Sequence, residues 1–312
     1  MGKMSPGLMD IFKYRRLSFR IFWWTFFLAI MTVSVPYLYG QNYQTFDSEL
    51  KSIRERSLWT FGPFKINPYL RLSAGYDNNI FGAVGESAPI ADFVATILPQ
   101  FYVYLPVRHS LLLSFFWGPQ YVYFAETKRE RALNNTYSFT FRFLALNRFV
   151  LSAASDLAKT KRRISSEIYR RIIEQSNGYR GSFSYETARK TSIGISSSVR
   201  RYRYEDVALP DSPVLLSDAL NREERNGSID FYYRIFTDSS FFVNFGYTSY
   251  RFTTPEARFR DSHSYQFYAG IQFPPLGRAT GTLSLGYKEF MPQDKSLKAY
   301  HGLVGDTSVG YR

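Results

Sequence analysis

The chain carries the sequence YSFTFRF at residues 137–143, which places an aromatic ring at every second position and a polar side chain between each pair of rings. Successive side chains of a β-strand point to opposite faces, so one face of this segment is aromatic and the other is polar. The same alternation recurs over residues 241–248 and 265–273. Each of the three segments is therefore predicted to be a β-strand with one apolar and one polar face.

Alternation of this kind, followed outward along the chain, predicts about twelve strands. Their predicted ranges are 68–76, 92–105, 110–124, 133–146, 148–158, 177–187, 190–204, 226–236, 239–252, 263–273, 278–290 and 304–312. No linker interrupts the pattern, so we predict one domain over residues 68–312.

The connections between the predicted strands alternate between long and short. The long ones are Asp77–Ala91, Ala125–Ala132, Lys159–Ser176, Glu205–Arg225, Thr253–Ser262 and Met291–Leu303. The short ones are Pro106–His109, Asn147, Ala188–Arg189, Thr237–Asp238 and Pro274–Gly277. Outer-membrane barrels have tight periplasmic turns and long extracellular loops, whereas a soluble antiparallel sandwich has no reason to sort its loops in this way. Together these features predict an all-β, antiparallel up-and-down transmembrane β-barrel with extracellular long loops.

The composition agrees with this fold. Aromatic residues make up 19% of the chain, with 25 Tyr and 29 Phe, and barrels concentrate such residues in girdles at the two membrane interfaces. The chain has no cysteine, which excludes a disulfide scaffold and cysteine-ligated metal sites.

The N-terminal residues differ in kind from the rest. A basic segment precedes an uninterrupted apolar run over residues 21–35, which is short for a membrane-spanning helix. We predict a cleaved signal peptide over residues 1–40, cut near Gly40; an uncleaved anchor is the alternative. Residues 1–40 carry five basic side chains and one acidic side chain, so their removal lowers the formal net charge of the chain from +13 to +9. Residues 41–67 lack alternation and are predicted to be a periplasmic lead-in with a short amphipathic helix over 48–56.

Two segments carry a resemblance to a known family. The sequence YLRLSAGYDNNIF at residues 69–81 resembles the first strand and loop of a family of outer-membrane beta-barrel porins, and DFVATILPQ at residues 92–100 is similar to that family's second strand with its internal proline. The resemblance implies a pore for exopolysaccharide export, acting beside a periplasmic polysaccharide-export protein. It also implies a barrel of more than twelve strands.

The last four residues, 309–312, read as part of a strand that ends on Arg312. By family resemblance, outer-membrane barrels usually end on an aromatic residue that the barrel-assembly machinery recognises. We therefore expect that C-terminal strands are missing from this sequence and that the whole barrel has about 14–18 strands. A complete barrel of about twelve strands is the alternative.

The polar faces of the strands are predicted to line a lumen, whose side chains set the selectivity of a pore. The predicted lumen-facing residues are Tyr69, Arg71, Arg142, Arg180, Arg200, Tyr202, Tyr232, Arg234, Tyr268 and Lys288. Only Glu186 and Asp230 oppose their charge in this interpretation, so the lumen is expected to be basic and to attract anions such as acidic polysaccharide. The alternative is a closed interior held by salt bridges and hydrogen bonds.

The predicted outer loops are also basic. Their basic residues are Lys128, Arg129, Arg131, Lys159, Lys161, Arg162, Arg163, Arg170 and Arg171. They would bind anionic lipopolysaccharide or captured polymer, or would simply form a solvated face beside anionic lipid head groups. They match no recognised nucleic-acid-binding motif, so no nucleic-acid partner is expected.

An enzymatic role is not expected. The histidines, His109, His263 and His301, show no metal-binding spacing, and the one His–Ser neighbour pair would point to opposite faces of a strand. We expect no catalytic residues, no metal and no cofactor.

The leading hypothesis is an outer-membrane barrel of a Gram-negative-type bacterium that conducts or exports an anionic or polar solute, with polysaccharide as the specific candidate. The first alternative is a plugged structural or adhesive barrel that binds partners through its basic loops. The second is a soluble, secreted β-sandwich binding module. The functional hypothesis depends on analogy with a known family, whereas the fold assignment depends mainly on the residue pattern.

Overall fold

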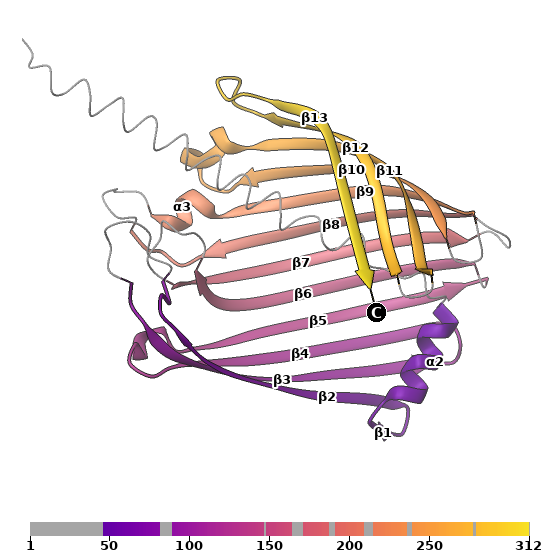
Figure 1. Ribbon diagram of the computed structural model, residues 1–312, viewed down its shortest axis with the longest axis horizontal. Helices are drawn as coiled ribbons and strands as arrows, with labels where there is room; N and C mark the ends of the chain where they lie inside the picture. Colours follow the sequence, from indigo (N-terminus) through magenta and orange to yellow (C-terminus); the bar gives the residue numbers. More distant parts are fainter. Residues whose placement is uncertain are drawn as a thin grey trace, which may run out of the picture. The chain divides into compact units, whose positions relative to one another are not determined.

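One antiparallel sheet of 13 strands, joined in sequence order from β1 to β13, makes up the fold (Figure 1). The computed structural model describes residues 46–81, 89–146, 148–163, 171–186, 191–208, 215–235, 239–276 and 279–311. All of them belong to one unit, Thr45–Arg312. The predicted signal peptide at residues 1–40 lies outside the described residues.

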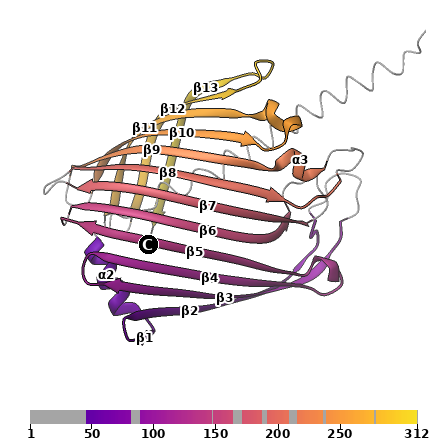
Figure 2. The same ribbon diagram turned by 180° about the vertical axis from the view of Figure 1, so that it is seen from behind.

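The strands follow one another in a simple up-and-down order, seen from both sides in Figures 1 and 2. The strands are β1 (Trp59–Phe61), β2 (Phe64–Asp77), β3 (Asp92–Val107), β4 (Leu111–Phe124), β5 (Ala132–Ala145), β6 (Phe149–Arg163), β7 (Arg171–Glu186), β8 (Thr191–Tyr204), β9 (Arg222–Arg234), β10 (Ser240–Phe252), β11 (Ser262–Leu276), β12 (Ala279–Pro292) and β13 (Tyr300–Tyr311). The helices are α2 (Phe46–Arg56), α3 (Leu216–Leu220) and the 3₁₀ helices η1 (Lys128–Glu130) and η2 (Pro255–Arg260). Among the described residues, no α-helix combines the length and apolarity that crossing a bilayer requires.

The predicted strands are confirmed as β2 to β13, and their loops are sorted as predicted. The short connections are 108–110, 146–148, 187–190, 235–239 and 277–278. The long connections are 78–91, 125–131, 164–170, 205–221, 253–261 and 293–299. We call these two ends of the sheet the short-turn end and the long-loop end.

Several predicted boundaries are wrong, mostly at the long-loop end. Residues 159–176 were expected to form a loop, but β6 continues to Arg163 and β7 already begins at Arg171. The ladder persists there because backbone pairing does not depend on side-chain polarity, and Lys161 still pairs with Ile173. Lys159, Lys161, Arg162, Arg163 and Arg171 are therefore strand residues, while Arg170 lies outside the described residues.

The predicted lead-in over residues 41–67 is also partly structured as sheet. Strand β1 pairs with the start of β2, with Phe61 opposite Phe64. Gly62 lies between them with φ of +56°, a left-handed conformation that glycine adopts without steric cost. The helix predicted over 48–56 is confirmed as α2.

The sheet has two chemically distinct faces, set by the period of two along each strand. Directly paired residues share a face, and one face carries Leu151, Phe183, Ile195 and Ile229 in an unbroken row across β6 to β9. Large apolar side chains of this face are exposed over the whole sheet. Examples are Leu72, Phe115, Phe139, Leu151, Phe183, Ile195, Ile229, Phe245, Phe267, Leu285 and Leu303. So extensive an exposed apolar face fits lipid as the surrounding solvent.

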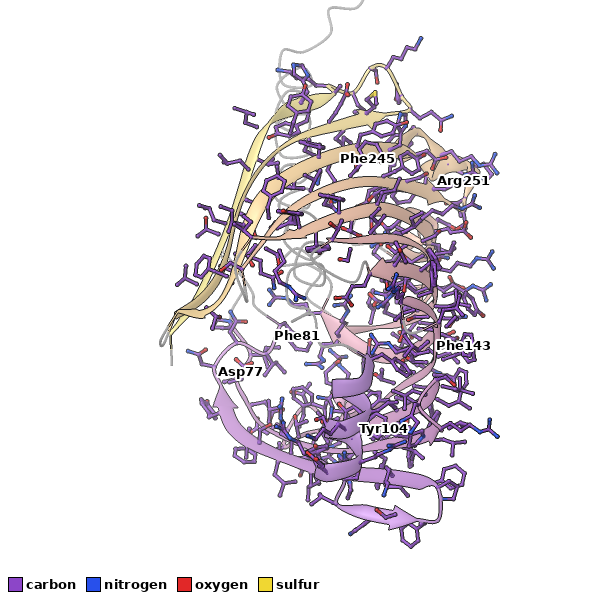
Figure 3. All side chains as sticks on the ribbon, turned by 90° about the vertical axis from the view of Figure 1, so that its right-hand side faces the viewer. Asp77, Phe81, Tyr104, Phe143, Phe245 and Arg251 are labelled. Carbon is purple, nitrogen blue, oxygen red and sulfur yellow. The ribbon has the colours of Figure 1, made fainter. Side chains whose placement is uncertain are left out.

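The opposite face is concave and is covered in part by α2 (Figure 3). Helix α2 forms because Phe46, Leu50 and Ile53 recur at helical spacing, and all three are buried. They pack on Leu112, which is 1% exposed, together with Tyr104 and other apolar residues of this face. Burying three such side chains contributes about 1.5–3 kcal/mol each to the docking of α2.

The sheet is not closed within the described residues. No pairing joins β13 to β1 or β2, and beyond its short contact with β1 the outer edge of β2 is unpaired. From Tyr69 onward β2 is exposed on both faces. A bilayer does not tolerate unpaired backbone groups, so these two edges need partners in the membrane.

Gly286 provides a test of how tightly the concave face packs. Tyr268 lies directly opposite Gly286 on the neighbouring strand. A Cβ atom added at Gly286 would lie 2.6 Å from Tyr268 Cδ1 and 2.2 Å from the Phe267 carbonyl oxygen. We expect Gly286→Val to destabilise the barrel by about 1–3 kcal/mol through overpacking. The measurement is the denaturant midpoint at which the unboiled protein loses its fast electrophoretic migration. Gly181→Val is the control, since nothing lies within 4 Å of that Cβ position; equal midpoints for both variants would contradict the prediction.

Candidate functional site

The residues predicted to face the lumen all lie on the concave face, since each has the strand parity opposite to the exposed apolar row. Arg142 is the direct neighbour of Leu112, which packs on α2. Between β8 and β9, Arg200 lies directly opposite Glu224, and Tyr202 lies directly opposite Arg222. The members on this face are Tyr69, Arg71, Arg142, Arg180, Arg200, Tyr202, Tyr232, Arg234, Tyr268 and Lys288. Their role as a solute path stays a prediction.

The same register places on this face acidic residues that were not among those predicted. Besides Glu186 and Asp230, they include Asp156, Glu174, Glu224 and Asp306. Alternation could have revealed them, because each occupies the polar parity of its own strand. The concave face therefore carries both charges, arranged as pairs.

Arg180 and Arg200 share one carboxylate. Asp156 Oδ2 lies 3.4 Å from Arg180 Nη2 and 3.9 Å from Arg200 Nη2. Gly178 lies directly opposite Arg200 on the neighbouring strand and leaves room for its guanidinium group. A Cβ atom added at Gly178 would lie 3.1 Å from Arg200 Nε. The two arginine side chains remain 50% and 40% exposed, so part of each guanidinium faces open space.

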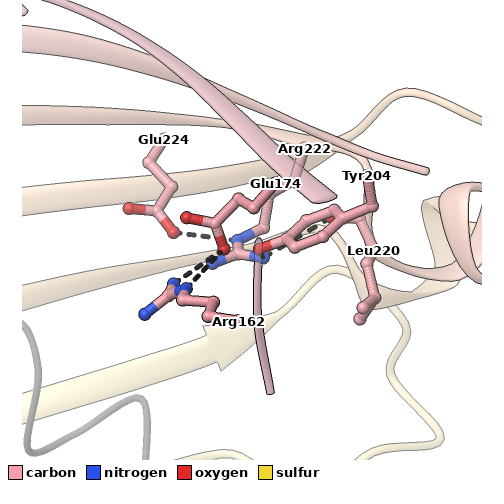
Figure 4. Close-up of polar contacts among 6 residues, drawn as sticks. All are labelled: Arg162, Glu174, Tyr204, Leu220, Arg222 and Glu224. Atoms are coloured by element: carbon pink, nitrogen blue, oxygen red, sulfur yellow. Dashed lines mark hydrogen bonds and ion pairs between the residues drawn. The ribbon is translucent and has the colours of Figure 1, made fainter. Parts of the chain in front are cut away.

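A second group of paired charges lies towards the long-loop end on β6 to β9 (Figure 4). Arg162 Nη2 donates to Glu174 Oε2 at 2.7 Å. Arg222 donates through Nε to Glu224 Oε1 at 2.8 Å and through Nη1 to the Tyr204 hydroxyl at 3.3 Å. These residues, with Asp156, Arg180, Arg200 and Tyr202, form what we call the concave charge ladder.

Aromatic rings accompany the ladder. The Arg222 guanidinium lies 4.6 Å from the centre of the Tyr202 ring, a cation–π distance. Nearer the short-turn end, Tyr69 meets Tyr102 edge-on with ring centroids 5.6 Å apart. The Arg222 side chain is only 12% exposed, whereas the ring of Tyr69 is exposed and the guanidinium groups of Arg180 and Arg200 are partly exposed on the same face. Such groups can bind hydroxylated and anionic solutes by stacking and charge-assisted hydrogen bonds.

Arg142 and Arg234 have acidic partners at the short-turn end. Arg142 Nη1 donates to Glu49 of α2, so an ion pair as well as apolar packing fixes the helix on the concave face. Arg234 Nη2 lies 3.7 Å from Glu186 Oε1. Helix α2 thus covers part of the face that the solute path would use.

Several of the basic residues that were predicted to lie in external loops donate hydrogen bonds to backbone carbonyl oxygens at the long-loop end. Arg131 donates to the carbonyl oxygens of Phe124 and Ala125 at 2.9 and 3.3 Å. Lys161 donates to the Arg129 carbonyl oxygen at 2.6 Å and lies 3.2 Å from Glu130. These contacts order the long-loop end, which is a structural role. Lys128 and Arg129 lie in η1.

The loop of η2 is tied to α3 by one partly buried cation, Arg260. Arg260 donates to the carbonyl oxygen of Ala219 and lies 4.2 Å from the centre of the Phe252 ring. Burial, together with the charge of Arg222, lowers the pKa of Arg260 to about 10. The side chain therefore stays charged at neutral pH and keeps this end of the sheet covered.

The described residues hold no group of three or more His, Cys, Asp or Glu side chains arranged to bind a metal ion. The histidines lie apart: His109 in a short turn, His263 and His301 on the apolar-parity face of β11 and β13.

Comparison with known proteins adds a family. Residues 151–312 match the model of the family described as "Putative beta-barrel porin 2". No curated protein matches the chain.

Solved structures with some likeness include outer-membrane proteins. Outer-membrane expressed OmpT of Vibrio cholerae is 10% identical, with 82% of this chain and 100% of that chain covered and a TM-score of 0.41. An outer membrane channel from Pseudomonas putida F1 is 9% identical, with coverage of 81% and 94% and a TM-score of 0.40. The translocator domain of the autotransporter NalP from Neisseria meningitidis is 10% identical, with coverage of 85% and 93% and a TM-score of 0.31. Likeness at this level carries no inference about activity.

The concave charge ladder yields a prediction about Asp156. In Asp156→Asn, Arg180 and Arg200 lose their shared counter-charge while the side-chain shape is kept, so the concave face becomes more positive. Exposed ion pairs contribute only about 0.2–1 kcal/mol, so the barrel should stay folded. The reversal potential in a salt gradient across a planar bilayer is expected to shift towards anion selectivity.

Glu256→Gln is the control for Asp156→Asn, because it removes the same charge from the exposed helix η2. The same shift in both variants would mean that Asp156 does not face the conducting path.

Proposed function

The chain belongs to the "Putative beta-barrel porin 2" family, and from this premise we propose that it forms an outer-membrane channel for polar or anionic solutes. The observation that carries the proposal is the division of the sheet into an exposed apolar face and a concave face with a ladder of partly exposed charges. Lipid would surround the first face and the solute would follow the second.

Family membership confirms the barrel-porin part of the resemblance noted in the sequence. The matched residues, 151–312, differ from the segments at 69–81 and 92–100 that suggested it. Export of exopolysaccharide stays a proposal. It is supported by the partly exposed guanidinium groups of Arg180 and Arg200 and the exposed ring of Tyr69 on one face, since acidic sugar polymers present carboxylates and apolar ring faces to such a surface.

The pairing of charges refines the proposed selectivity. A lumen lined by arginines alone would hold anions strongly, whereas arginines neutralised by Asp156, Glu174 and Glu224 attract them weakly enough for release. Conduction requires both entry and exit. We therefore propose modest anion preference.

A plugged structural barrel is the second candidate, favoured by α2. The helix packs on the concave face through apolar contacts and the Glu49–Arg142 ion pair. If α2 and further chain fill the lumen, the protein would act through its outer loops and not as a channel.

Undocking α2 separates these candidates. We expect the wild-type protein to conduct in a planar bilayer, and Leu50→Asp with Ile53→Asp to conduct more, because the two carboxylates cannot remain buried against Leu112. Lys51→Gln is the control, as that side chain is 75% exposed. A silent wild type with a conducting double variant would support the plugged barrel. Silence of both, with heat-modifiable migration retained, would contradict the channel.

Closure of the sheet is part of the proposal, and the absence of cysteine makes it testable. We expect further strands to lie between β13 and β2, because both edges are unpaired in the described residues. Tyr69→Cys would be combined in turn with cysteine at Val304, Asp306 or Ser308, all on the concave face.

No disulfide is expected from these double variants in the folded, membrane-inserted protein. A disulfide would require Cα atoms within about 7 Å and would show that β2 and β13 pair directly, giving a barrel of about twelve strands. Tyr69→Cys with Gln272→Cys, in the interior of the sheet, is the background control for chance oxidation.

A further inference from the structure

A groove lies at the long-loop end of β9 and β10 and has no part in the concave charge ladder. It encloses about 530 Å³ and is lined by Arg225, Arg251, Arg258 and Asp261, with Glu223 and Gln293. We call it the rim groove.

The rim groove opens on the lipid-facing side of the sheet. On β10, Arg251 has the same parity as Phe245 and Tyr247, both exposed. On β9, Arg225 has the parity of Ile229. Arg251 is the last residue but one of β10, so it lies at the long-loop end. A solute on the concave face would therefore not meet these two arginines.

Along the strands, the rim groove lies just beyond the apolar band, on the side of the long-loop end. From Arg251 towards the membrane, the outward residues of β10 are Ser249, Tyr247 and Phe245. Tyr247 lies 5.2 Å from Tyr265 between ring centroids, as interfacial aromatic residues do in a girdle. Arg251 lies four residue steps along the strand from Tyr247, which is about 13 Å. In the proposed membrane location, this is the level at which lipid head groups are expected.

The charges of the groove are not balanced within it. Glu223 is bound between Arg201 and Arg225, each 2.6 Å away. Asp261 Oδ1 accepts the Phe252 backbone N–H at 2.7 Å. Arg251 and Arg258 are exposed and have no ion-pair partner among the described residues. Two guanidinium groups are thus available to an anion.

Positive charge continues along the same rim. The basic residues of outward parity on β6 to β8 include Lys159, Arg163, Arg201 and Arg203. Arg203 and Lys159 flank Gln175 as its two cross-strand neighbours. A row of cations above an aromatic girdle complements a layer of head groups that carry several phosphates each.

We infer that the rim groove binds a phosphate of a phosphorylated glycolipid in the outer leaflet, with Arg251 and Arg258 as its two guanidinium donors and Arg225 beside them. The occupant is a lipid because the groove faces the bilayer at head-group level. The inference rests on the proposed membrane location, but not on conduction.

Native mass spectrometry of the full chain in detergent tests this, with bisphosphorylated lipid A and phosphatase-treated lipid A as probes. We expect the wild type to retain the bisphosphorylated form about tenfold more tightly, since hydrogen bonds to charged groups are the strong ones. Arg251→Gln with Arg258→Gln should abolish most of this preference. Lys295→Gln with Lys298→Gln, which removes the same charge from the neighbouring exposed loop, should keep it.

Three results would overturn the inference: no dependence on phosphate in the wild type, equal loss in both double variants, or displacement of the lipid by inorganic phosphate at matched concentration. Heat-modifiable migration shows that each variant is folded. Conductance measured on the same samples separates failure of this inference from failure of the proposed channel, because Arg251 and Arg258 lie off the concave face.

Discussion

Every feature of this protein depends on one requirement: in a bilayer, backbone N–H and C=O groups must be paired within the protein. Within the described residues, an antiparallel ladder from β2 to β13, in which each strand is bonded to the next in sequence, meets it everywhere except at the two outer edges of the sheet. The ladder fixes the register, and register decides which face each side chain occupies. A slip of one residue in β5 would send Arg142 to the lipid and Phe143 to the concave face.

The concave face collects the charged residues because lipid takes the other side. They come from neighbouring strands, and they pair because partly enclosed charges are costly alone. Asp156 of β6 serves Arg180 of β7 and Arg200 of β8. Helix α2 is also held on this face by a charge pair, because Glu49 pairs with Arg142 while Leu50 packs on Leu112. The concave face is thus both the interior packing surface and the candidate solute path.

The two ends of the sheet differ because they face different surroundings. At the short-turn end the strands turn back within a few residues. At the long-loop end β6, β8, β9 and β10 run past the apolar band, and their outward side chains change from apolar ones, such as Leu157 and Tyr247, to basic ones, such as Lys159 and Arg251. Asp92 shows how this end is ordered: its buried carboxylate accepts the backbone N–H groups of Ala125, Glu126 and Thr127. Basic residues outside such local contacts, above all Arg251 and Arg258, are the ones available to an external anion.

Period-two alternation by itself determined the all-β fold, the strands from β2 to β13, the sorting of long and short connections, and the face on which Arg142, Tyr202 and Lys288 lie. These properties are local, because side-chain direction alternates along any extended strand. Only the tertiary structure decided that β6 continues past Lys159 to Arg163 and that β7 already begins at Arg171. It also decided that Asp156 and Glu224 neutralise the arginines beside them, and that α2 covers part of the concave face. Those outcomes depend on which residues meet across strands and on how the sheet curves, and neither is encoded in the spacing of residues along one strand.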